Sequence, residues 1–246
     1  GNMSLYPNEK YFQGESSEVE FHPCYYNTLF LGNGNKIYRS SDGGNSFDSL
    51  YAFGTNTARP VMQIEVSRSN PQVIYAYAMQ TNTLAKLLKS IDGGATWVIK
   101  DFPSGITSAV SGSITLSATD ENKLWVCFGH NTNSNKVFAT YDGGTTWQNL
   151  TTPTLNGHRT VNIVHQLGTA SLVYLATNKA VFYRDSTMSD WQLFHTGLPG
   201  TASSNLMKIF YNLNYQDLHP KYEDNISNWM TILKEIMNIQ NINEHV

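Results

Sequence analysis

The pattern of apolar and polar positions repeats about every 50 residues along this chain. Each repeat opens with a short apolar run, passes through a turn rich in Ser, Asn, Asp and Gly, and then shows a second and a third apolar run. The opening runs are Val19-Glu20-Phe21, Ile64-Glu65-Val66, Ile114-Thr115-Leu116 and Ile163-Val164-His165. Runs this short, bounded by turn residues, predict strands rather than helices.

An eight-residue segment follows the third run of each repeat, and we name these segments box turns. Clear copies occupy residues 40–47, 90–97 and 140–147, and a degenerate copy without glycines occupies 184–191. Each clear copy holds an aspartate that can accept hydrogen bonds from its own turn. Its glycines supply the positive φ of a tight hairpin, and the aromatic residue at its end buries a large apolar face. We assign this structural role to Asp42, Gly44, Phe47, Asp92, Gly94, Trp97, Asp142, Gly144, Trp147 and Trp191.

Four short strands in each repeat, with no helix between them, predict an all-β fold of the β-propeller type with four-stranded blades. A fourth strand is expected to start at the aromatic residue that ends each box turn. Four blades are clear, and we expect about five in all.

The box turns resemble the Asp-box (BNR) repeats of sialidases, xyloglucanase-type glycoside hydrolases and sortilin-like ectodomains, over roughly residues 19–200. The resemblance implies a propeller, and it implies that the box turns lie at the end opposite the binding site. It leaves activity open, because catalytic and non-catalytic members of these families share the motif.

The repeat fades after residue 200. Apolar residues then recur at helical spacing from about 225 to 240, which predicts a C-terminal amphipathic helix. We therefore expect an N-terminal extension over 1–18, blades over 19–200, and a degenerate last blade with the helix over 201–246. An open blade edge has to be covered or paired. A closed ring, an open ring covered by the helix, a larger ring that is truncated or out of frame after residue 200, completion by a partner chain and self-association through an open edge stay as alternatives.

Composition and charge limit the classes of partner and cofactor that the chain is expected to bind. Charged residues make up only 14% of the chain, net charge is −3, and the pI is near 6.2. We expect no nucleic-acid or anionic-membrane partner from this balance, and no membrane insertion, because no apolar stretch approaches the roughly 20 residues that span a bilayer. The seven histidines lack HxH or HExxH spacing, and Cys24 and Cys127 occupy non-equivalent positions. We expect neither a metal nor another cofactor.

The sequence contains no clear set of catalytic residues for either class of enzyme that the box turns resemble. A sialidase needs an arginine cluster for a substrate carboxylate, and only Arg59 and Arg159 are expected away from the box turns. A xyloglucanase-type enzyme needs two carboxylates across a cleft. Glu65 lies in a predicted strand and Asp101 near a strand end, and the sequence gives neither a clear partner. We assign no catalytic residue and leave enzymatic activity open.

The loops opposite the box turns are rich in Asn, Thr and Ser, which suits sugar hydroxyls and equally suits plain surface loops. Their candidate ligand-binding residues are Arg59, His130, His158 and Arg159. We expect a non-catalytic interaction module that recognises a glycan or a protein through this end and is secreted, periplasmic or on the cell surface. A glycoside hydrolase or sialidase-like enzyme is the alternative. A structural or assembly propeller that docks through the 225–240 helix is the second alternative.

Overall fold

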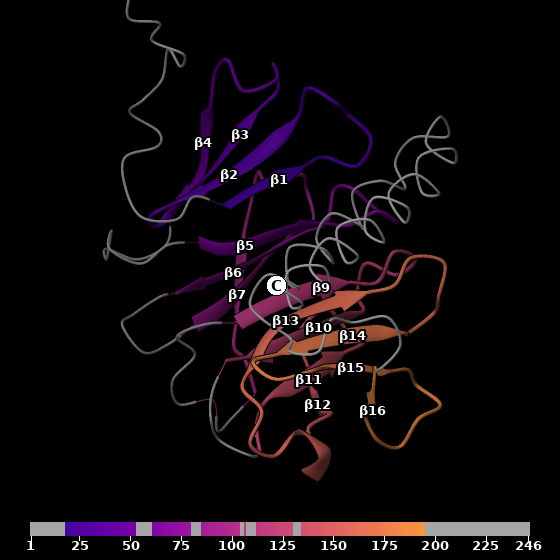
Figure 1. Cartoon of the computed structure of the whole chain (residues 1–246). Coiled ribbons are helices and arrows are strands. Elements are labelled where there is room, and N and C mark those ends of the chain that lie inside the picture. The colour runs from indigo at the N-terminus through magenta and orange to yellow at the C-terminus, as the bar shows by residue number, and fades with distance from the viewer. Residues whose placement is uncertain are drawn as a thin grey trace, which may run out of the picture.

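A computed structural model of the chain describes residues 18–52, 61–79, 85–103, 106, 112–129 and 134–194. These residues form an all-β structure of four four-stranded antiparallel sheets, as the repeat predicts. The sheets follow one another in chain order (Figure 1). In these ranges no helix has the length and apolar character needed to cross a membrane. The predicted helix over 225–240, together with the rest of 201–246, lies outside the described residues.

The strands lie where the apolar runs predict them. The first sheet contains β1 (Glu18–Phe21), β2 (Leu29–Asn33), β3 (Lys36–Ser40) and β4 (Asp48–Ala52). The second contains β5 (Val61–Val66), β6 (Ile74–Met79), β7 (Ala85–Ser90) and β8 (Val98–Lys100). The third contains β9 (Gly112–Leu116), β10 (Leu124–Phe128), β11 (Val137–Thr140) and β12 (Gln148–Asn149). A 3-10 helix, η2 (Pro153–Leu155), precedes the fourth sheet of β13 (Thr160–His165), β14 (Val173–Thr177), β15 (Val181–Arg184) and β16 (Gln192–Leu193). Each fourth strand starts one residue after the aromatic residue, not at it as predicted.

The sheets meet along their first strands. In every sheet the strands are paired in chain order, so β1, β5, β9 and β13 each form one edge. β1 packs against β5, β5 against β9, and β9 against β13. Sheets that meet edge to edge around an axis are the blades of a β-propeller. We therefore call β1, β5, β9 and β13 the inner strands.

The register makes the four blades equivalent residue by residue. In each blade one inner-strand residue lies opposite an aromatic residue of the second strand. These pairs are Glu20 with Phe30, Glu65 with Tyr75, Thr115 with Trp125, and Val164 with Tyr174. The same position therefore holds two carboxylates, a hydroxyl and an apolar side chain in successive blades.

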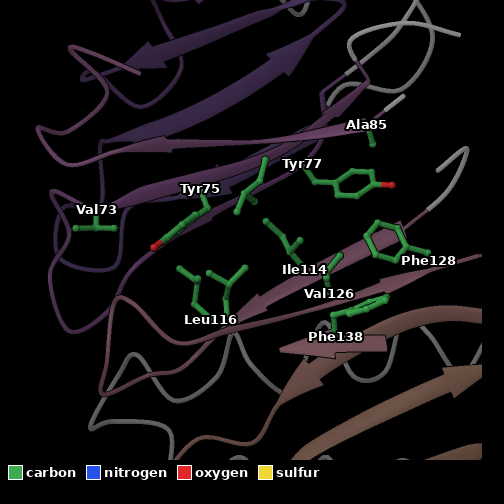
Figure 2. Packing of buried hydrophobic residues seen from close by; sticks show 11 residues of the cluster. Val73, Tyr75, Tyr77, Ala85, Ile114, Leu116, Val126, Phe128 and Phe138 are labelled. Carbon is green, nitrogen blue, oxygen red and sulfur yellow. The ribbon is translucent and has the colours of Figure 1, made fainter. Parts of the chain in front are cut away.

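Side chains alternate between the two faces of each inner strand, since successive residues of a strand point to opposite sides. Ile64 and Val66 pack with Phe30 of the preceding blade. One blade further on, Ile114 and Leu116 pack in the same way against the blade that contains β6. Figure 2 shows this second contact, in which Tyr75 and Tyr77 lie across from Ile114, Val126 and Phe138. The core of the molecule thus lies between blades, and it repeats from one blade to the next.

Each clear box turn is closed by its own side chains. The Asp92 carboxylate accepts hydrogen bonds from the Thr96 backbone N–H at 2.8 Å and from its hydroxyl at 2.6 Å, and the Ser90 hydroxyl donates to it at 2.8 Å. Gly93 and Gly94 both have positive φ, at 68° and 91°. Asp42 and Asp142 repeat this pattern in their own turns. The carboxylates are thus used by the hairpins.

The box turns also join neighbouring blades. A Cβ on Gly144 would approach Leu87 Cδ2 of the preceding blade to 2.8 Å, so the backbone lies directly against that side chain. The indole N–H of Trp191 donates to the Leu150 carbonyl oxygen of the preceding blade at 2.8 Å. In the degenerate copy Asp185 accepts from Thr187, only two residues away, and so forms a different and shorter turn.

Candidate functional site

Polar side chains join the inner strands across the boundaries between blades. The Gln63 side chain accepts a hydrogen bond from the Ile114 backbone N–H at 2.9 Å and donates to the Ile114 carbonyl oxygen at 2.8 Å. In the next blade, the Thr115 hydroxyl accepts from the His165 backbone N–H at 3.1 Å. Inner strands have no neighbouring strand on their axial side, so these side chains satisfy backbone groups that would otherwise be unpaired. We call these contacts axial clamps.

Carboxylates form the same contacts at the first boundary. Glu18 accepts from the Ile64 backbone N–H, and Glu20 accepts from the Val66 backbone N–H. Glu65, equivalent to Glu20, accepts from the Gln63 amide at 2.7 Å. The alternation of the strands therefore brings three glutamates to the axis.

A hollow of about 100 Å³ lies between the four inner strands. Its lining comes from equivalent positions of all four blades, mainly the second half of each inner strand and the residues after it. Polar residues of the lining include Glu20, Gln63, Glu65, Arg68 and His165. Apolar lining side chains include Phe21, Leu116 and Leu167. We call this space the axial hollow.

The axial hollow lies at the end of the propeller that carries the box turns. Its lining residues lie at the C-terminal ends of the inner strands and just beyond them, where each chain segment enters the turn between the first and second strands of its blade. The box turns bond to those same turns, as Gly43 N–H donates to the Asn27 carbonyl and Gly93 N–H to the Gln72 carbonyl. The resemblance had implied that the binding site lies at the opposite end, whereas this hollow is at the end that carries the box turns.

The glutamates at the axis hold their protons more tightly than usual. Burial raises the pKa of Glu65 to about 8 and that of Glu18 to about 7. Burial also raises the pKa of Glu20, and the neighbouring Glu65 and Glu18 carboxylates raise it further, while Arg68 opposes the shift. Like charges in a shielded site cannot all ionise at low cost. Near neutral pH the group therefore carries fewer negative charges than its three carboxyls suggest.

His165 lies where the other blades place an apolar residue. It is equivalent to Val66 and Leu116, and its ring stacks on Trp125 with 5.1 Å between centroids and 12° between planes. The residue is 2% exposed, and neither ring nitrogen has a hydrogen-bond partner in the part of the chain that is described. Burial lowers its pKa to about 4, Lys123 acts in the same direction, and the Thr169 backbone opposes them. A neutral imidazole is therefore packed against Trp125 in the interface between the third and fourth blades.

Exposed tyrosines lie beside the hollow. The turn after β1 carries Tyr25, which is 64% exposed, and Tyr26, which is 74% exposed. His22 holds this turn, because its Nδ1 accepts from the backbone N–H groups of Cys24 and Tyr25. Its ring stacks on Tyr25 at 4.6 Å. The tyrosines are thus presented on a fixed turn next to lining residue Phe21.

The structure places two of the four predicted binding residues at the other end of the propeller. His158 packs edge-on against Phe182, and its Nδ1 lies 3.1 Å from the Thr177 hydroxyl. The Arg159 side chain is exposed, and its backbone exchanges hydrogen bonds with Asn178. The ammonium of Lys136, a fully buried residue, donates to the His158 and Leu155 carbonyl oxygens at 2.5 Å. His158 is thus part of the packing, while Arg159 is adjacent and free to face solvent.

The remaining predicted residues either lie outside the described part of the chain or lie on its surface. Arg59 and His130 lie outside the described residues. Asp101 forms an ion pair with Lys86 on the surface, away from the axis. Within the described ranges no group of three or more His, Cys, Asp or Glu side chains is placed to hold a metal ion.

Comparison with known proteins gives the fold. The family model described as Cse1 matches residues 176–245, a short part of the chain. No curated protein matches the sequence. An ancestral GH74 enzyme has a similar structure, with a TM-score of 0.59 and 17% identity over 74% of this chain and 26% of that one.

Two further structures are similar. The GH74 xyloglucanase from Xanthomonas campestris gives a TM-score of 0.54 and 18% identity over 77% of this chain and 31% of that one. YCF48 from Cyanidioschyzon merolae gives 0.52 and 15%, over 73% and 56%. The chain spans about a quarter to a third of the length of the GH74 structures and just over half of YCF48. At these identities the likeness shows a shared β-propeller fold.

Proposed function

We propose that the chain is a non-catalytic interaction module that binds a protein partner at the end of the propeller that carries the box turns. The observation that carries this proposal is the pair of exposed tyrosines, Tyr25 and Tyr26, on a fixed turn beside the axial hollow. Tyrosine offers a large apolar face and a polar tip at low entropic cost, which is why it is enriched in protein interfaces. Box-turn residues Ile91 and Tyr141, which are 68% and 51% exposed, add apolar surface at the same end.

The test compares the two ends of the propeller. A tagged chain is used to capture partners, and the captured proteins are compared with those of a Tyr25→Ser/Tyr26→Ser double variant and of Arg159→Ala. We expect the tyrosine variant to lose a specific partner and Arg159→Ala to keep it, because Arg159 lies at the far end. Loss with Arg159→Ala alone would instead place the binding site at the end expected from the sequence.

A glycan is tested in parallel on an array. Specific glycan binding that depends on Tyr25 and Tyr26 would change the class of partner and keep the site. Binding of neither proteins nor glycans by a correctly folded chain would refute the module. The helix predicted over 225–240 lies outside the described residues, and docking through it is a separate alternative.

A glycoside hydrolase is the second candidate, and the meeting of Glu20 and Glu65 in one hollow favours it. The GH74 neighbours add a resemblance of fold. Against it, such enzymes need one protonated and one ionised carboxyl, whereas both of these carboxyls have raised pKa values. Hydrolysis of a chromogenic glycoside that is lost in Glu65→Gln and kept in Asp101→Asn would make the enzyme the better account.

A further inference from the structure

Each blade of this propeller has two apolar faces that differ in their residues. The face toward the preceding blade carries alternate residues of the inner strand, such as Ile64 and Val66, and we call it the front face. The face toward the following blade carries a residue of the second strand, such as Tyr75, and we call it the back face. Three boundaries join the four blades, and at each boundary a back face packs against a front face.

The front face of the first blade is apolar and exposed to solvent. Val19 and Phe21 lie at the positions that Ile64 and Val66 occupy in the second blade. Val19 is 42% exposed, whereas its equivalent Ile64 is 0% exposed, and Phe21 is exposed as well. This blade lies at one end of the row of sheets (Figure 1). A face built like three buried faces is therefore open at that end.

The back face of the fourth blade, at the other end of the row, carries a cluster of aromatic rings. Tyr174 lies at the position of Tyr75 and Trp125, which are buried against their following blades. The centroid of its ring lies 6.3 Å from that of Tyr183 and 5.6 Å from that of Phe194. All three rings of the cluster are half-buried. The fourth blade is the last that the structure describes, so within these residues no front face covers the cluster.

The axial clamps continue to the same two ends. Asn162 occupies the clamp position of Gln63 and Ser113. Its amide has the donor and the acceptor with which Gln63 holds both backbone groups of Ile114. The shorter Ser113 also reaches a backbone N–H of its following blade, at 3.5 Å. Val19 is equivalent to Ile114, and no clamp reaches its backbone from the described part of the chain.

The chain itself contains the complement of each end face. A back face packs against a front face, and among the four described blades one of each is left over. No box turn follows the copy at 184–191, so a second copy of the chain is the candidate for a further blade of this kind. Two copies supply eight blades, which lies within the typical range of four to eight, and three copies would exceed it.

We propose that two copies of the chain pair head to tail and form one ring of eight blades. The front face of each first blade lies against the back face of the other copy's fourth blade, and Asn162 clamps the Val19 backbone across the contact. Such a contact joins two different surfaces, and it closes into a ring when the rotation returns to its start. This inference goes beyond the proposed function, because it concerns the ends of the row of blades and not the end with the box turns.

The first experiment is sedimentation velocity of the full chain over a wide range of concentration. We expect a species of twice the 27.6 kDa of one chain. A folded chain that stays monomeric at every concentration would overturn the proposal and assign the two end faces to other residues of the chain. Species that keep growing with concentration would overturn the closed ring, because an unclosed contact of this kind produces filaments.

Two charged variants test the two faces separately. Val19→Lys places a charge in the front face of the first blade, and Tyr183→Lys places one in the back face of the fourth. An unpaired charge in an apolar contact is costly, so we expect each to weaken pairing by about a hundredfold or more. Pairing that survives both substitutions would refute the proposed contact.

Matched controls lie on surfaces that the proposed contact does not use. Val98→Lys changes an exposed valine of the outer strand β8, and Leu193→Lys changes the other face of the fourth blade, beside Phe182. Both controls should pair like the parent chain. Urea unfolding of every variant shows whether the monomer is still folded.

A mixture of the two charged variants tests the head-to-tail arrangement. Neither variant should pair with itself, because each lacks one of the two surfaces of every contact. The mixture still contains one intact contact, between the back face of the Val19→Lys chain and the front face of the Tyr183→Lys chain. With one variant fluorescently labelled, we expect a mixed pair that is weaker than the parent pair. If one variant pairs with itself and the mixture forms no mixed pair, then like faces meet and the proposal is wrong.

Asn162→Leu tests the clamp across the contact, and Ser113→Ala is its control. The Ser113 hydroxyl donates to Asn162 Oδ1 at 2.5 Å within one chain, so both substitutions remove this bond. Only Asn162→Leu also removes the clamp, and it should weaken pairing by about tenfold more than Ser113→Ala, the size of one hydrogen bond. Equal effects would show that Asn162 does not reach the second copy. Tyrosine-dependent partner capture by a strictly monomeric chain would overturn this inference and leave the proposed function intact.

Discussion

Gln63 offers the most direct test of the axial clamps. The side chain is 5% exposed and bonds both backbone groups of Ile114, at 2.9 and 2.8 Å. Gln63→Met keeps nearly the same volume but removes both contacts, together with the hydrogen bond that Gln63 donates to Glu65. A buried backbone group left without a partner costs roughly 1–3 kcal/mol, so the two Ile114 groups alone set an upper limit of about 6 kcal/mol. The adjoining hollow can admit water to one of them, and we therefore expect about 2–3 kcal/mol.

The assay is urea unfolding followed by tryptophan fluorescence, with the slope compared between variants to confirm that only stability changed. The expected loss corresponds to a fall in melting temperature of roughly 4–10 °C for a chain of this size. Gln148→Met is the matched control, because Gln148 is an exposed residue of β12. If both variants change the free energy of unfolding by less than about 0.5 kcal/mol, the clamps do not hold the blades together.

Three further outcomes follow from the structure. Gly144→Ala should destabilise the fold more than Gly168→Ala in the same unfolding assay. Both glycines have positive φ, but only at Gly144 would the added Cβ lie 2.8 Å from a side chain of a neighbouring blade. Equal losses of stability in the two variants would refute the close contact. Burial raises the folded-state pKa of Glu65 from its ordinary value of 4.5 to about 8, so the folded chain holds a proton that the unfolded chain releases. The free energy of unfolding should therefore fall as pH rises through this window, and the fall should be smaller in Glu65→Gln; identical pH profiles would contradict this. Ellman's reagent should label the exposed Cys24 at once and Cys127 only after unfolding, since Cys127 is buried and burial raises the pKa of its thiol to about 12. Rapid labelling of both thiols in the folded chain would show that the interior of the third blade is open.

Much of the fold can be predicted from local chemistry. Positive φ at Gly43 and Gly44, an aspartate that closes its own turn, and an aromatic residue at the end are determined within eight residues of the sequence. Short apolar runs fix the strands in the same way. Because these signals are local and recur, the four-stranded blade is predictable from the repeat alone.

The candidate site was harder to predict, because it depends on which strand faces the axis. Glu20 and Glu65 occupy the same position in the aligned repeats, so an alignment of the repeats is the sequence pattern that pairs these two carboxylates. A carboxylate in a strand appears isolated until the blades are placed around a common axis, and then equivalent residues become neighbours. His165 gives a similar lesson, since its match to Val66 and Leu116 predicts burial but not the stacking on Trp125.

The axial clamps have a consequence for how such a chain can change over evolutionary time. The requirement on a clamp residue is to accept a hydrogen bond from the backbone of the next blade, and Glu18, Gln63 and Thr115 all meet it with different side chains. Contacts to backbone do not depend on the partner's side chain, so neighbouring repeats need not mutate together. A duplicated unit would therefore find a compatible neighbour on either side at the moment it arose. Sequence drift between the copies is then tolerated wherever a hydrogen-bond acceptor is kept.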